Sequence, residues 1–186
     1  MDRMPPLNPD EMSEVQRKAA EELSSGPRGA VRGPFIPLLR SPEFMSRLQK
    51  TGEYLRFHSA LIPRLTEFVI LITARQWTQQ YEWFMHHPLA LQAGLKPETV
   101  QAIADGRRPS SMAEDEEIVY DFCDELSRTR GVSNDSYERA IRRFGEQGVI
   151  DLVGVHGYYS MLAMVLNVAQ TPLPDNAPAP LAPFPR

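Results

Sequence analysis

Residues 61–94 read LIPRLTEFVILITARQWTQQYEWFMHHPLALQAG, and this stretch decides the fold class. From Arg64 to Trp77 the apolar residues leave hardly any polar face, which is typical of a buried helix. Thr78 is expected to cap a second helix that ends at Gly94, because short polar side chains accept hydrogen bonds at helix starts and glycine tolerates the left-handed turn at helix ends. The sequence therefore predicts two consecutive helices, of which the first is buried.

Helical signals continue on both sides of this stretch. No run alternates apolar and polar residues with the period of two that a half-buried strand shows. Serine is expected to cap two of the later helices, through Ser110 or Ser111 in one and Ser133 in the other. The sequence predicts an all-α, compact multi-helix bundle, whose other helices span about 9–24, 41–58, 97–105, 112–130, 133–145 and 146–169.

Proline marks the boundaries of the folded body. Six of the 17 prolines fall in residues 172–186, PLPDNAPAPLAPFPR, where their spacing favours extended polyproline-type backbone. This tail is expected either to wrap a neighbour or to be mobile. We predict a helical domain over 34–171, with an N-terminal helix and linker over 1–33 packed on it.

Composition limits the classes of function. The 186 residues are 42% apolar and 24% charged, as in one globular domain rather than a disordered chain. The net charge is −4 and no run of Lys or Arg exceeds two, which argues against nucleic acid as a partner. Cys123 is the single cysteine, so one chain holds no disulfide, CxxC pair or cysteine zinc site.

The location of the protein follows from its apolar segments. Residues 1–18 lack the apolar stretch of a secretory signal, so a cytoplasmic protein is expected. Residues 152–174 contain no formally charged side chain, as a membrane span would. They do contain His156, Ser160 and Asn167, and such polar groups favour a buried helix over a membrane-spanning one. A membrane is therefore not expected as a partner.

Three polar residues share one face of the helix that follows Thr78. Gln79, Glu82 and His86 stand at positions i, i+3 and i+7. A carboxylate four residues before an imidazole orients the ring, which suits a general acid or base near neutral pH. The same spacing also occurs in ordinary surface pairs, worth a few tenths of a kcal/mol.

Two further charged residues stand on the most apolar helix. A buried Glu67 needs a partner or a proton, unless it lies exposed near the start of the helix. Arg75 is either a partner for Glu67, an anchor for a substrate carboxylate or a charge favoured at a helix C-terminus. Tyr158 is expected to offer its hydroxyl to a pocket or to pack with that hydroxyl satisfied.

The remaining histidines do not form a recognisable site. His87 points about 100° away from its neighbour His86 around the helix, and His58 and His156 are isolated. Four histidines without HxH or HExxH predict no metal site. The absence of GxGxxG, GxxxxGK[ST] and GxSxG gives no sign of a nucleotide cofactor or a nucleophile elbow.

Several of these segments together resemble a known family. LIPRLTE at 61–67, the apolar helix that ends in Thr73-Ala74-Arg75, the histidine of the next helix and ALQAGLKPE at 90–98 resemble the carboxymuconolactone decarboxylase family. That family includes the alkyl hydroperoxidase D proteins. The resemblance covers about 34–171 and extends to GPF at 33–35 and LLRSPE at 38–43.

The resemblance separates two branches of this family. The peroxidase branch has a Glu, then after eleven residues a CxxC pair, then a His four residues after the second Cys. In this sequence the frame reads Glu67, Gln79, Glu82 and His86, so both cysteines are absent. Because the thiolate is the nucleophile, peroxidase activity does not carry over. The decarboxylase branch resembles this chain in having a carboxylate near position 82, and it works without metal or organic cofactor.

The resemblance implies an all-helical trimer or hexamer with sites near subunit interfaces. The function expected is that of a cofactor-independent decarboxylase or lyase acting on a small carboxylated lactone or an intermediate of aromatic degradation. Alternatives are a non-catalytic oligomeric binding protein and an alkylhydroperoxidase-like antioxidant protein. The expected site has His86, Glu67 and Glu82 as catalytic residues and Arg75, Gln79 and Tyr158 as substrate-binding residues.

Overall fold

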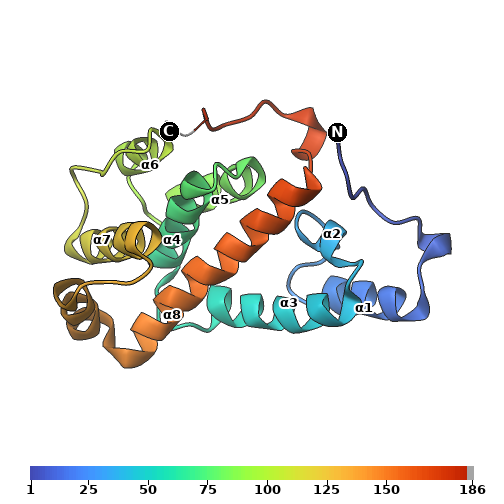
Figure 1. Ribbon diagram of the computed structural model, residues 1–186, viewed down its shortest axis with the longest axis horizontal. Coiled ribbons are helices and arrows are strands. Elements are labelled where there is room, and N and C mark those ends of the chain that lie inside the picture. Colours follow the sequence, from blue (N-terminus) through green and yellow to red (C-terminus); the bar gives the residue numbers. More distant parts are fainter. Residues whose placement is uncertain (184–186) are drawn as a thin grey trace.

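One helix, α4, lies at the centre of the molecule. The computed structural model describes residues 1–183, and within that range it contains no β-strand, which confirms the all-α prediction. In Figure 1 the long helix α8 crosses in front of α4. The helices that pack around α4 (Pro63–Gln76) are α3 (Pro42–Phe57), α5 (Gln80–Gln92), α6 (Pro97–Ala104), α7 (Glu114–Thr129) and α8 (Asn134–Ala169).

The burial of α4 is as complete as its sequence predicts. Every residue from Leu65 to Arg75 is buried, and Phe68 and Ile70 have no exposed surface. Fully burying such a side chain contributes roughly 1.5–3 kcal/mol relative to leaving it in water. The other helices are therefore organised by the need to cover every side of α4.

The connection between α4 and α5 is short and differs from the prediction. Thr78 does not cap α5; it adopts a left-handed backbone with φ of +46° and closes the C-terminus of α4. Gln79 is the N-cap, because its Oε1 accepts from the Tyr81 backbone N–H at 2.6 Å. The prediction failed because a tight hairpin needs a left-handed residue directly after α4, which moves the cap along by one. Gly94, with φ of +102°, ends α5 as expected.

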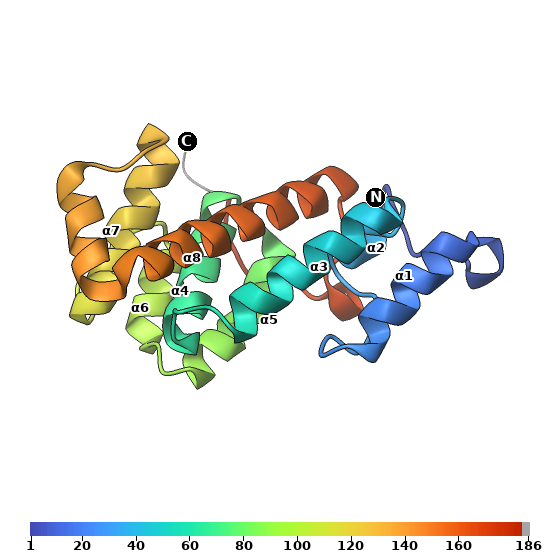
Figure 2. The same cartoon turned by 90° about the horizontal axis from the view of Figure 1, so that it is seen from below.

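The N-terminal region contains more elements than predicted. The helix expected over 9–24 is a 3₁₀ turn at Pro9–Glu11 followed by α1 (Glu14–Ser25). Ser13 separates the two, since its backbone N–H and hydroxyl form a reciprocal capping box with Gln16. A short helix α2 (Phe35–Leu38) lies in the segment expected to be a loop. Figure 2 shows α1 alongside α3, far from α7.

The starts of α7 and α8 test two predicted caps. Ser110 and Ser111 do not cap α7, which begins later, at Glu114; the Glu116 carboxylate instead accepts from the Ala113 backbone N–H at 3.0 Å. Four acidic residues in its first turn suit the positive end of the helix dipole, so no serine is required there.

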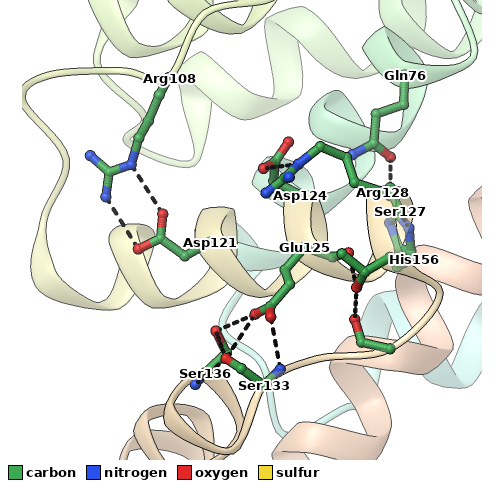
Figure 3. Close-up of polar contacts among 12 residues, drawn as sticks. Gln76, Arg108, Asp121, Asp124, Glu125, Ser127, Arg128, Ser133, Ser136 and His156 are labelled. Atoms are coloured by element: carbon green, nitrogen blue, oxygen red, sulfur yellow. Dashed lines mark hydrogen bonds and ion pairs between the residues drawn. The ribbon is translucent and has the colours of Figure 1, made fainter.

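The predicted cap of α8 is confirmed. The Ser133 hydroxyl accepts from the Ser136 backbone N–H at 3.3 Å, and Glu125 of α7 binds both serines (Figure 3). Gly145, with φ of +70°, breaks α8 where the sequence separates two helices.

The proline-rich tail returns to the body of its own chain. The backbone of Leu181, which is buried, exchanges two hydrogen bonds of 2.9 Å with the side chain of Gln80. Arg75 Nη1 donates to the Ala182 carbonyl at 2.8 Å. The tail therefore covers the α4–α5 connection, while the part of the predicted tail at 184–186 lies outside the described residues.

Helix α8 is, within residues 1–183, the one helix long and apolar enough to cross a membrane. Of its most apolar 18-residue window, 56% is buried against the rest of the protein. That degree of burial is typical of a core helix in a globular protein, as the polar residues in this segment led us to expect.

The loop between α3 and α4 depends on one buried carboxylate, Asp151. Its Oδ2 accepts from the Ala60 backbone N–H at 2.7 Å and its Oδ1 from the Tyr54 hydroxyl at 3.2 Å. Asp151→Ala is expected to lower the free energy of unfolding by about 1–3 kcal/mol, because two donors lose their acceptor. Urea denaturation measures the change. Glu138→Ala, in an exposed ion pair with Arg142, is the control and should cost under about 0.5 kcal/mol; equal losses would contradict the role of Asp151.

Candidate functional site

The α4–α5 hairpin brings Glu67 and His86 together. Glu67 lies one turn inside α4 and is 8% exposed, so it is not the exposed helix-start residue considered above. Its Oε2 lies 2.6 Å from Nδ1 of His86, which is itself buried. Arg56 of α3 lies 3.9 Å from the other oxygen of Glu67. Glu67 therefore has a hydrogen-bond partner in His86 and a positive charge nearby in Arg56, as a buried carboxylate requires.

The second ring nitrogen of His86 faces Glu82. Nε2 lies 3.5 Å from Glu82 Oε2, one helical turn away on α5. The sequence left open which glutamate is the closer partner of His86. The structure gives a division: Glu67 binds Nδ1 at hydrogen-bond distance, and Glu82 stands near Nε2.

Glu82 is the least compensated group of the three. It is 4% exposed, and its Oε1 is buried with no hydrogen-bond partner. Burial raises the pKa of Glu82, while the charges of His86, Arg56 and Arg28 act in the opposite direction. A carboxyl with a raised pKa beside an imidazole is an arrangement that can hold and pass a proton.

These side chains border a cavity of about 210 Å³. Glu82 and His86 line it, whereas Glu67 lies behind His86. The ring of Tyr159 meets the His86 ring edge to face, with centroids 5.2 Å apart. Apolar side chains on the wall come from several helices and include Phe35, Phe57, Met85, Leu89 and Leu162.

Sequence reasoning missed several residues of this cavity. Arg28, Arg32 and Arg56 line it together with Tyr159. Arg28 and Arg32 come from a segment whose Gly-Pro pairs predict only a loop, and no local pattern associates them with α5. Arg56 lies at the C-terminal end of α3, and no local sequence pattern relates that position to α5.

Two predicted substrate-binding residues have structural contacts instead. Gln79 occupies the N-cap of α5, and its Nε2 donates to Asn167 Oδ1 at 2.9 Å. Tyr158 does not line the cavity; its hydroxyl accepts from Arg28 Nη2 at 3.3 Å. Burial raises the pKa of Tyr158 to about 12, so it stays a neutral partner of Arg28.

The structure places Arg75 away from Glu67 and the cavity. It is 3% exposed and lies in the last turn of α4, whereas Glu67 lies near the start. There it contacts the tail and lines a pocket that includes Ile103 and Tyr120. Because Glu67 and Arg75 are eight residues apart, over two turns separate them along the helix. Arg75 is therefore neither a partner of Glu67 nor part of this site.

His156 belongs to a separate polar network that joins three helices. Its Nδ1 lies 2.9 Å from Thr73 Oγ1 of α4, and its Nε2 lies 3.0 Å from Ser127 Oγ of α7. Ser127 also contacts Gln76, and Figure 3 shows this chain of contacts at the end of α7. Burial lowers the pKa of His156 to about 4. His156 is thus a neutral histidine with both ring nitrogens partnered.

The other histidines contribute nothing to the cavity. His87 contacts the ring of Trp83 at 6.1 Å between centroids, and His58 is exposed at the end of α3. Within residues 1–183, no group of three His, Cys, Asp or Glu side chains is arranged to hold a metal ion.

Comparison with known proteins identifies the fold. No protein-family model matches the sequence, and no curated protein does. The structure is similar to the alkylhydroperoxidase AhpD core of an uncharacterized peroxidase-related protein from Ralstonia eutropha JMP134, with a TM-score of 0.75 and 15% identity over 93% of this chain and 92% of that chain. The chain therefore has the AhpD-like all-helical fold that the resemblance implied.

The environment of His156 generates a pH prediction. Its pKa is about 4 in the folded protein and near 6.5 when unfolded, so the unfolded chain takes up the proton first as pH falls. The stability that neutral His156 provides is complete above about pH 6.5, and about 3 kcal/mol of it is lost by pH 4. Denaturant unfolding at pH 7 and pH 4 should show a smaller acid loss for His156→Gln than for wild type. An identical acid loss would contradict a neutral buried His156.

Proposed function

We propose that this protein is a cofactor-independent enzyme of the carboxymuconolactone decarboxylase type. Its substrate would be a small carboxylated lactone or an intermediate of aromatic degradation. The observation that carries the proposal is the Glu67–His86–Glu82 arrangement, in which His86 and Glu82 line a cavity and Glu67 holds His86 from behind. In this arrangement general acid–base chemistry needs no group from outside the chain.

Each member of the arrangement has a distinct role. Glu67 accepts from Nδ1–H of His86, which fixes the ring and leaves Nε2 directed toward Glu82 and the cavity. Arg56 places a positive charge 3.9 Å from the other oxygen of Glu67. His86 is thus the group that exchanges a proton with substrate, and Glu67 is a positioning residue behind it.

The reaction follows from this geometry. The bond between the ring carbon and the substrate carboxylate breaks, carbon dioxide leaves, and the electron pair moves into a conjugated carbonyl. His86 Nε2 then donates its proton to the carbon that lost the carboxylate, and solvent restores the proton through Glu82. The balance is one carboxylate and one proton consumed for one carbon dioxide released.

Turnover on a panel of carboxylated lactones and related acids tests the proposal. Loss of ultraviolet absorbance and release of carbon dioxide are followed without added cofactor. His86→Ala is expected to lower kcat/KM by about 10²–10⁴-fold, the usual contribution of a positioned acid or base. His87→Ala is the matched control, because that ring faces Trp83 rather than the cavity, and its activity should equal wild type.

The same assay distinguishes the alternative functions. Turnover that is equal in wild type and His86→Ala would overturn the catalytic role. Binding of the acids without turnover of any of them would favour the non-catalytic binding protein.

Thiol peroxidase activity is disfavoured by the only cysteine, although the structural neighbour is named peroxidase-related. Cys123 has no exposed surface and lies in the core, and burial raises the pKa of its thiol. Because the thiolate is the reactive form, Cys123 should resist a thiol reagent in the native protein and react after unfolding in urea. Spectrophotometric titration with such a reagent measures this, and rapid modification of the native protein would restore the peroxidase alternative.

The expected trimer or hexamer stays a prediction, with one supporting observation. Helix α8 exposes Ile150, Val153, Met164 and Val168, at 69%, 40%, 42% and 59% of their surface. An assembly that covers this face would bury apolar area that the single chain leaves in water.

A further inference from the structure

The segment between α1 and α2 forms one wall of the cavity. Arg28 and Arg32 of this segment and Phe35, the first residue of α2, line the same space as Glu82 and His86 of α5. The sequence placed residues 1–33 outside the helical domain, as a part packed on it. The structure instead gives this linker a place beside the reactive groups.

Arg28 is held in place by two contacts. Its guanidinium carbon lies 4.5 Å from the centre of the Phe35 ring, and its Nη2 donates to the Tyr158 hydroxyl at 3.3 Å. Gly52 makes this approach possible, because a Cβ there would lie 2.6 Å from Arg28 Nη2 and 2.1 Å from the Tyr158 oxygen. A positioned guanidinium loses less freedom on binding than a mobile one.

Two buried polar atoms that line this cavity lack hydrogen-bond partners. Arg28 Nε is a donor without an acceptor, and Glu82 Oε1 is an oxygen without a donor. Buried polar groups in native proteins are nearly always paired, so such exceptions call for an explanation. A ligand that offers an acceptor to the first atom and a hydroxyl to the second satisfies both.

The other arginines of the cavity already have partners. Arg56 lies beside Glu67 and over the Phe57 ring, and Arg32 donates to the Arg28 backbone carbonyl at 2.8 Å. Of these three arginines, Arg28 is the one with a buried nitrogen that has no hydrogen-bond partner.

We infer that Arg28 is the residue that selects and positions the anionic group of the substrate, with Glu82 Oε1 holding a hydroxyl of the same molecule. The substrate class is a flat, single-ring carboxylic acid that carries a phenolic or enolic hydroxyl. This assignment rests on the proposed function, and it gives to Arg28 the anchoring role expected of Arg75. The rings of Phe35, Phe57 and Tyr159 suit a flat ligand.

The position of Glu82 fits the chemistry of such a substrate. A hydroxyl is both donor and acceptor, so it pairs with Glu82 in either protonation state. Arg28 holds the carboxylate until it leaves as carbon dioxide, and the electron pair then moves to the oxygen of the conjugated carbonyl. Glu82 Oε1 is placed to hydrogen-bond that oxygen until His86 delivers the one proton of the reaction to the carbon.

Binding of model acids to the full chain tests the inference without any turnover. Isothermal titration calorimetry compares 4-hydroxybenzoate with 4-hydroxybenzamide, which keeps the shape and the hydroxyl but lacks the charge. Wild type is expected to prefer the acid by about tenfold or more, as a charge-assisted hydrogen bond provides. Arg28→Met should remove the preference, and Arg47→Met, in an exposed ion pair with Glu43, should keep it.

The second variant leaves Arg28 in the sequence. Gly52→Ala displaces the guanidinium through the added Cβ and is expected to reduce the preference for the acid as Arg28→Met does. Thermal unfolding of each variant separates a lost ligand contact from a lost fold. The role of the hydroxyl is tested with 4-methoxybenzoate. Wild type should bind it more weakly than 4-hydroxybenzoate, whereas Glu82→Met should bind the two compounds with equal affinity.

Three results would overturn the inference: an equal preference for the acid in wild type and Arg28→Met, an equal affinity of wild type for both compounds, or no binding of the acid. These outcomes are distinct from failure of the proposed function. If the preference for the acid depends on Arg28 but the protein shows no turnover, the role of Arg28 stands and the proposed enzymatic function is wrong. If turnover depends on His86 but not on Arg28, the enzymatic function stands and the role of Arg28 is wrong.

Discussion

The contact between Glu67 and His86 is the constraint around which the structure is arranged. A carboxylate inside the most apolar helix of the chain carries a large cost unless a hydrogen-bond donor or a positive charge reaches it. His86 at 2.6 Å and Arg56 at 3.9 Å meet that requirement from two other helices. The tight turn at Thr78 and the approach of α3 to α4 bring these two partners to Glu67. Pairing the buried Glu67 therefore brings titratable groups together beside the cavity, where they can also act on a ligand.

The cavity beside His86 combines segments that are far apart in the sequence. Its arginines come from the α1–α2 linker and α3, its acid–base groups from α5 and its aromatic edge from α8. The two unpartnered atoms, Arg28 Nε and Glu82 Oε1, are of opposite hydrogen-bonding character. Such a pair is costly in an empty protein and useful in one that binds a ligand, since the ligand supplies the missing partners.

Several details of the prediction failed for one shared reason. Thr78, Ser110 and Ser111 have the side chains of good caps, but helix boundaries are decided by the turn that the neighbouring packing allows. Gln79 has the spacing of a ligand-binding residue and serves as a cap. Arg75 carries the charge that a substrate carboxylate requires, yet α4 turns it toward the tail. In each case the residue type suited the predicted role, but the sequence does not give the direction in which the side chain points.

The sequence by itself determined the all-α fold, because helical periodicity, caps and breaks are local properties that act over a few residues. It also determined that Glu82 and His86 meet, since a separation of four residues on a helix places two side chains on one face. Only the tertiary structure decided that Glu67 binds the other ring nitrogen and that Arg28 borders the same cavity. Those contacts join residues 19 and more than 50 positions apart. Their existence depends on how helices pack, which is settled by the burial of α4 as a whole and not by any local pattern.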